Sequence, residues 1–73
     1  MKIKIIKLNR NKIEKACKLD LIQDLKDIFL NYELTLENNI IFYDNLDMDY
    51  SNAMDNLFLA MNDFRSFCDF HNL

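Results

Sequence analysis

The sequence predicts an α+β domain with the order β-α-β-β-α, in which a small three-stranded antiparallel sheet carries two helices packed on one face. Three observations lead to this prediction. An alternating segment opens the chain, a hairpin pattern lies near its middle, and two longer segments have helical periodicity. At 73 residues the chain is expected to be a single domain, 1–73, close to the smallest size that folds without disulfides or metals.

The first two elements are a strand and a long helix. Residues 2–8 alternate Lys with apolar residues, the pattern of a strand with one solvent-facing side. Asn11 followed by Glu14 resembles a capping box and predicts a helix beginning there. Asp20 with Gln23 offers a second cap, so a kinked helix and two shorter helices both stay open. The expected apolar stripe consists of Ile13, Cys17, Leu21, Leu25, Ile28, Phe29 and Tyr32.

The hairpin pattern spans residues 33–44 and turns at two asparagines, which tolerate left-handed backbone. Its second strand, 40–43, is apolar on both faces, so it is expected in the middle of the sheet, antiparallel to both neighbours. The sheet face that carries no helix is then expected to present Ile41 and Tyr43, with Ile6 as a further candidate.

The last element is a helix that starts at a cap formed by Ser51 or Asn52 and runs to about Phe70. Acidic residues just before it suit the positive end of the helix dipole. The apolar stripe covers about half of the helix circumference and consists of Tyr50, Ala53, Met54, Leu57, Phe58, Ala60, Met61, Phe64, Phe67 and Cys68.

Charge is divided by position along the chain. Residues 1–32 hold eight of the nine Lys and Arg against four acids, a balance of +4. Residues 33–73 hold eight acids against Arg65 alone, a balance of −7. Such a polarised charge distribution acts on association and on the choice of partner.

The residue types argue against catalysis. The chain has no glycine, so it lacks phosphate-binding loops, dinucleotide fingerprints and nucleophile elbows. The single histidine, His71, lies near Cys68, but no third group is placed to orient the pair. The sequence therefore predicts a protein that is not an enzyme and that has no cofactor.

Metal binding is not predicted either. Cys68 and His71 supply half of a zinc site, and no second pair completes it. The segment 45–49 resembles the start of a calcium loop, but Tyr50 stands where that loop needs glycine and Asn56 where it needs the bidentate Glu.

The two cysteines indicate a reducing compartment. No secretion signal is visible, and the longest apolar run, 57–61, is far too short to cross a bilayer. Cys17 and Cys68 are therefore expected to be reduced, buried thiols of a cytoplasmic protein without membrane contact.

The main functional hypothesis is a non-catalytic inhibitor whose acidic and aromatic surface docks onto a larger protein with a basic, nucleic-acid-binding surface. Carboxylates can stand where phosphates would lie, as in anti-defence proteins of phages and other mobile elements and in immunity proteins. The predicted partner-binding residues are Tyr43, Asp44, Asp47, Asp49, Asp55, Asp63 and Asp69.

Two alternatives remain. The chain could be a small nucleic-acid-binding regulator that uses the basic first strand and helix. It could also be a structural subunit of a homo-oligomer. The main hypothesis itself expects a homodimer, because dimerisation would supplement a thin core. Apolar residues outside the predicted core stripes are the candidates for self-association, namely Leu19, Leu30, Leu59 and Phe70.

Overall fold

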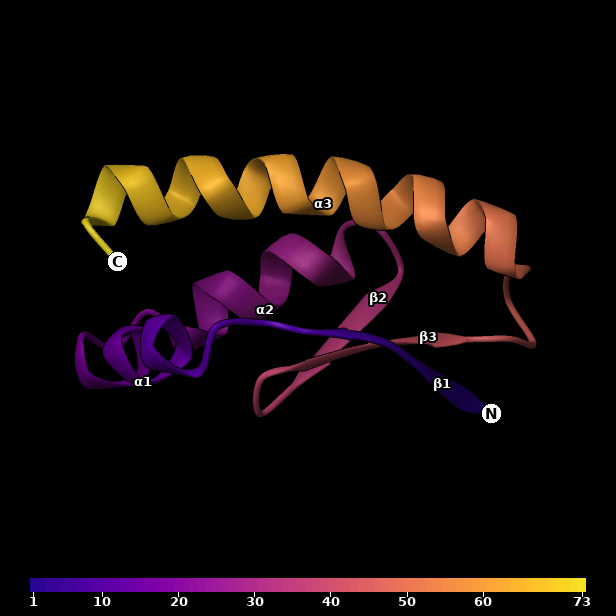
Figure 1. The fold of residues 1–73 in the computed structure, drawn as a ribbon, viewed down its shortest axis with the longest axis horizontal. Helices are drawn as coiled ribbons and strands as arrows, with labels where there is room; N and C mark the ends of the chain where they lie inside the picture. The colour runs from indigo at the N-terminus through magenta and orange to yellow at the C-terminus, as the bar shows by residue number, and fades with distance from the viewer.

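The computed structural model describes residues 1–73 and has the element order β-α-α-β-β-α (Figure 1). The α+β class and the three-stranded antiparallel sheet are confirmed, whereas the predicted order is wrong by one helix. The elements are β1 (Lys2–Lys7), α1 (Arg10–Lys18), α2 (Ile22–Leu30), β2 (Leu34–Glu37), β3 (Ile40–Asp44) and α3 (Tyr50–His71).

The expected first helix is divided at Asp20. This residue has a left-handed φ of 59°, and the Leu21 amide returns to the Ala16 carbonyl at 2.8 Å, which closes the last turn of α1. The start of α1 also differs from the prediction. Asn9 is the N-cap, because its side chain accepts a hydrogen bond from the Asn11 amide at 2.9 Å.

The sheet has the order β1-β3-β2, so β3 is the central strand as predicted. Tyr43 lies opposite Leu34, and Ile41 lies opposite Leu36. All four side chains are buried, so the face that they share is the core face. The prediction that Ile41, Tyr43 and Ile6 lie on the helix-free face is therefore wrong. The sequence of a strand that is apolar on both sides does not show which side faces the core. In β3 the inner side is the one that pairs with the buried leucines of β2.

Both α2 and α3 lie on one side of the sheet, and the other face is open (Figure 1). Phe29 of α2 is fully buried, and its ring centroid lies 5.8 Å from that of Phe64 of α3. The core of the domain therefore lies between the two helices and the inner face of the sheet. No helix is long and apolar enough to cross a membrane.

The C-terminal end of α3 rests against α1. Lys12 Nζ donates to the Leu73 main-chain oxygen at 2.8 Å, and Lys15 Nζ donates to that of Asn72 at 3.1 Å. Because the carbonyl end of a helix is the negative end of its dipole, these two lysines stabilise it. They are thus used within the fold.

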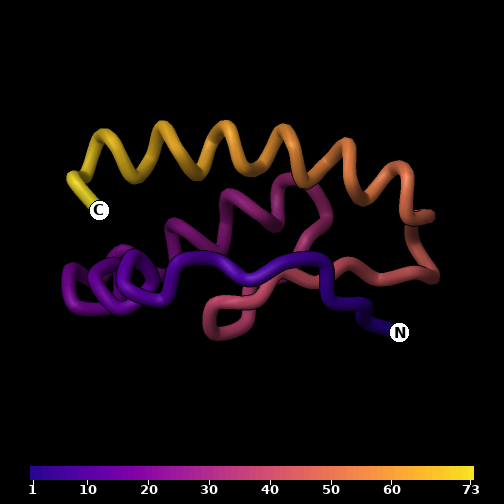
Figure 2. The backbone as a smooth tube through the Cα atoms, in the orientation of Figure 1, coloured from indigo at the N-terminus to yellow at the C-terminus, as the bar shows by residue number.

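The charges are also separated in space. The N-terminus and the start of α3 lie towards one end of the molecule, and α1 with the end of α3 lies at the other (Figure 2). The longest dimension is 34 Å. The cations of α1 therefore lie at one end, and the acidic residues around the start of α3 lie at the opposite end, together with the Met1 ammonium group and Lys2 of β1.

Candidate functional site

The candidate surface is the acidic end, which we define as Asp44, Asp47, Asp49 and Asp55. The four carboxylates come from the last residue of β3, from the connector that follows it and from the first two turns of α3. Asp44 is partly exposed, and the other three residues are exposed. The fold thus brings together four of the predicted partner-binding residues.

Asp44 is held by the chain itself. Its Oδ1 accepts hydrogen bonds from the Leu46 amide at 2.9 Å and from the α-ammonium group of Met1 at 3.0 Å. These contacts, with the Leu46 hydrogen bond the largest cause, lower the pKa of Asp44 below its ordinary value of 3.8. Asp44 therefore organises the connector as well as adding negative charge.

Asp49 caps α3, which the sequence had assigned to Ser51 or Asn52. Its carboxylate accepts from the Asn52 amide at 2.8 Å, and its backbone is extended, as an N-cap requires. Its carboxylate has no cationic partner. Asp49 thus starts the helix and still presents its charge to solvent.

Asp47 and Asp55 are the free carboxylates of the acidic end. The structure has two ion pairs, Met1 with Asp44 and Lys2 with Glu37, so no lysine or arginine side chain pairs with any acid of this end. The one cation of the first half of the chain that pairs with this end is the α-ammonium group of Met1, on Asp44, so the carboxylates of Asp47, Asp49 and Asp55 keep uncompensated charges.

Two exposed apolar side chains lie among these acids, and sequence reasoning missed both. Leu46 is 82% exposed, and Tyr50 is 66% exposed although it had been placed in the core stripe of the last helix. An apolar residue inside an acidic connector was the available signal for Leu46. For Tyr50 the helical spacing was misleading, because the first turn of α3 extends beyond the core.

The remaining predicted partner-binding residues lie elsewhere. Tyr43 is only 6% exposed and belongs to the core, so it is not part of the surface. Asp63 lies in the middle of α3, where it accepts a hydrogen bond from the Tyr32 hydroxyl at 2.6 Å. Asp69 lies in the last turns of α3, far along that helix from the acidic end.

The four candidates for self-association are all exposed, with fractions between 48% for Leu59 and 82% for Phe70. They come from the ends of α1 and α2 and from two positions on α3, so they do not share one element. Their exposure agrees with their assignment outside the core. Their role in an oligomer stays a prediction.

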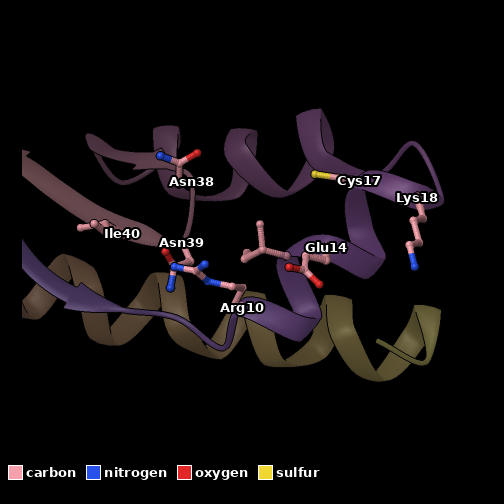
Figure 3. Close-up of a pocket in the computed structure, with 8 residues that line it drawn as sticks. Arg10, Glu14, Cys17, Lys18, Asn38, Asn39 and Ile40 are labelled. Atoms are coloured by element: carbon pink, nitrogen blue, oxygen red, sulfur yellow. The ribbon is translucent and has the colours of Figure 1, made fainter.

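An open pocket of about 680 Å³ lies between α1 and the tip of the β2-β3 hairpin. Figure 3 shows Arg10 pointing towards Asn39 and Lys18 on the other side of the pocket. Cys17 lines the pocket and is exposed, so the prediction that both thiols are buried is wrong for Cys17. The predicted stripe placed Ile13 and Cys17 on one helix face, but only the fold could add Arg10 to that helix and bring the hairpin tip opposite it.

The other thiol, Cys68, is buried, and burial raises its pKa. The structure gathers no three His, Cys, Asp or Glu side chains in an arrangement that could hold a metal ion. Comparison of the chain with protein-family models, with curated proteins and with solved structures found no match.

Proposed function

We propose that the protein is a non-catalytic binding module that docks its acidic end onto the basic surface of a larger, nucleic-acid-binding protein. It would act in the cytoplasm as a small inhibitor of the anti-defence or immunity type. A nuclease is the partner class that we favour, because its active site faces a groove built to receive phosphates.

One observation carries this proposal. Three exposed carboxylates without a cationic partner, those of Asp47, Asp49 and Asp55, lie in the same part of the fold as two exposed apolar side chains, Leu46 and Tyr50. Acidic residues that serve only to keep a surface soluble do not require exposed apolar side chains beside them. In protein–protein interfaces, the few residues that contribute most of the binding energy are often aromatic and are surrounded by polar residues.

The two kinds of residue would do different work. The carboxylates would attract a basic partner at long range and raise the rate of association. Leu46 and Tyr50 would lose water at the contact and slow dissociation. Because Asp44 and Asp49 are fixed by hydrogen bonds to backbone amides, their charges are already in position before the partner arrives.

The proposal can be tested with a panel of sequence-nonspecific nucleases, with cleavage of duplex DNA as the readout. The test variant carries Asp47→Asn, Asp49→Asn and Asp55→Asn. Asn is as good an N-cap as Asp, so the cap of α3 is kept. The matched control carries Glu14→Gln, Asp20→Asn and Asp24→Asn, which removes the same charge from the first half of the chain.

We expect the wild-type protein and the control to inhibit at least one nuclease, and the test variant to inhibit it much more weakly. We also expect inhibition by the wild-type protein to weaken as salt is added. Failure to inhibit any nuclease, or equal inhibition by both triple variants, would contradict the proposal.

A further inference from the structure

The open face of the sheet places an aromatic ring next to cations. Phe42 of β3 lies opposite Lys4 of β1 and Thr35 of β2, and Lys7 lies opposite Ile40. Residues opposite each other in a sheet project from the same face. Since Ile41 and Tyr43 point into the core, Phe42 and Ile40 point outwards together with the two lysines.

Some cations of β1 and α1 are engaged within the fold, and others are free. Lys12 and Lys15 bind the end of α3, and Lys2 pairs with Glu37. Among the cations of β1 and α1, the side chains that remain exposed and outside both ion pairs are those of Lys4, Lys7, Arg10 and Lys18.

The pocket beside α1 continues this face. Ile40 projects from the open face and also lines the pocket, together with Arg10 and Lys18. Figure 3 shows these residues around the opening between α1 and the hairpin. At about 680 Å³ the pocket lies in the size range of small-molecule sites and has room for a base with its sugar.

We infer that the open face binds single-stranded nucleic acid. Phe42 would stack on an unpaired base, and Lys4 and Lys7 would contact the phosphates on either side. The strand would continue past Ile40 to the pocket, where Arg10 and Lys18 would contact further phosphates. This activity uses none of the residues of the acidic end and is independent of the proposed function.

Three acidic residues lie on the same path. Glu14 lines the pocket, Asp44 lies at the far end of β3, and Glu37 holds Lys2. Lys2 is opposite Asp44 and Glu37 is opposite Ile40, so their ion pair crosses the face diagonally, past the row of Phe42. Both side chains of this pair are about half exposed, so the pair is weak and can open when a strand binds.

The inference is tested by fluorescence anisotropy with labelled oligothymidylate and oligouridylate of about ten nucleotides, a length that small single-strand-binding domains cover. A duplex of the same length is the comparison. We expect both single strands to bind at low salt. Tighter binding of oligouridylate would indicate contacts to the 2′-hydroxyl groups, and tighter binding of oligothymidylate would indicate stacking on the methylated base.

The salt dependence of the binding constant measures the number of phosphate contacts. Four contacts give a slope of log K against log salt of about −3 for a single strand. Lys4→Gln with Lys7→Gln should bring the slope to about −1.5. The matched control, Lys26→Gln with Arg65→Gln, changes the charge equally on α2 and α3 and should leave the slope unchanged.

Phe42→Leu should weaken binding about tenfold through the loss of base stacking, whereas Phe58→Leu on exposed α3 should not. Glu37→Gln should tighten binding and make the slope steeper by about 0.7, because it frees Lys2. This gain cannot arise from damage to the fold. Absence of binding to either single strand, equal binding of the duplex, or binding that Phe42→Leu and the Lys4/Lys7 variant leave unchanged would overturn the inference.

Discussion

The Tyr32 hydroxyl donates a hydrogen bond of 2.6 Å to Asp63 Oδ2, and this bond joins the turn before β2 to the middle of α3. Asn56 supports the same junction, since its side chain donates to the Tyr32 carbonyl at 2.9 Å. One of the carboxylates assigned to partner binding therefore has a partner within the chain.

This contact predicts a loss of stability at high pH. The hydrogen bond to Asp63, together with burial and the Asp63 charge, raises the pKa of Tyr32 above its ordinary value of 10.0. Because the pKa is raised in the folded state, the hydrogen bond contributes its full stabilisation below pH 10.0. This stabilisation is lost as pH rises through the folded-state pKa of Tyr32. Ultraviolet titration should show that Tyr32→Phe removes a late-ionising part of the tyrosine signal of the wild-type protein. Tyr50→Phe is the control, and a late-ionising part that is undiminished in Tyr32→Phe would contradict the assignment.

The start of α3 offers a second prediction. Asp49→Ala should lower the free energy of unfolding by about 1 kcal/mol, because the Asn52 amide loses its acceptor. Asp49→Asn should cost much less, because the amide oxygen still caps the helix. Urea denaturation would measure both. Ser51→Ala should be nearly neutral, and a larger loss in Ser51→Ala than in Asp49→Ala would show that the cap is misassigned.

The backbone of Glu33 gives a third prediction. Four residues have a left-handed φ. Three of them are Asn or Asp, and the fourth is Glu33, with a φ of 60°. Its Cβ is strained in this conformation, so Glu33→Gly should raise the free energy of unfolding by about 0.5–1 kcal/mol. Glu33→Ala keeps the Cβ and should give no such gain. Thermal denaturation of the two variants separates strain from charge, and equal stabilisation by both would count against strain.

The largest loss of stability is expected for a substitution in the hydrophobic core. Phe29 is fully buried against Phe64, whereas Phe58 is 68% exposed, so its predicted place in the core stripe of the last helix is wrong. Phe29→Ala should cost about 3–5 kcal/mol, enough to unfold a domain of this size, and Phe58→Ala about 0.5 kcal/mol or less. Circular dichroism would show the difference. Similar losses at the two sites would mean that α3 packs with another face towards the sheet.

Local patterns were sufficient for the element types. The alternation of residues 2–8 gave β1, and the two helical stripes gave the positions of most buried residues, including Ile13, Leu25 and Phe64. Strand order also followed, because a strand that is apolar on both faces belongs in the middle. Sequence could not decide which face of β3 is inside, since that depends on pairing with β2.

The helix boundary and the site were less predictable. The break at Asp20 depends on a left-handed residue and a returning hydrogen bond from Leu21, and the sequence pattern allowed it without requiring it. The acidic end was predicted as a charge cluster, but its apolar members were not. Whether Tyr50 or Tyr43 is exposed depends on where the core ends, which no local pattern contains.

The most direct test of the central claim is the rate of association between this protein and a nuclease that it inhibits, measured by stopped flow across ionic strength. The account predicts fast association that slows by about tenfold or more as salt is added, and slow, nearly salt-independent association when Asp47, Asp49 and Asp55 are all changed to Asn. Association of that triple variant at the wild-type rate and with the wild-type salt dependence would contradict it.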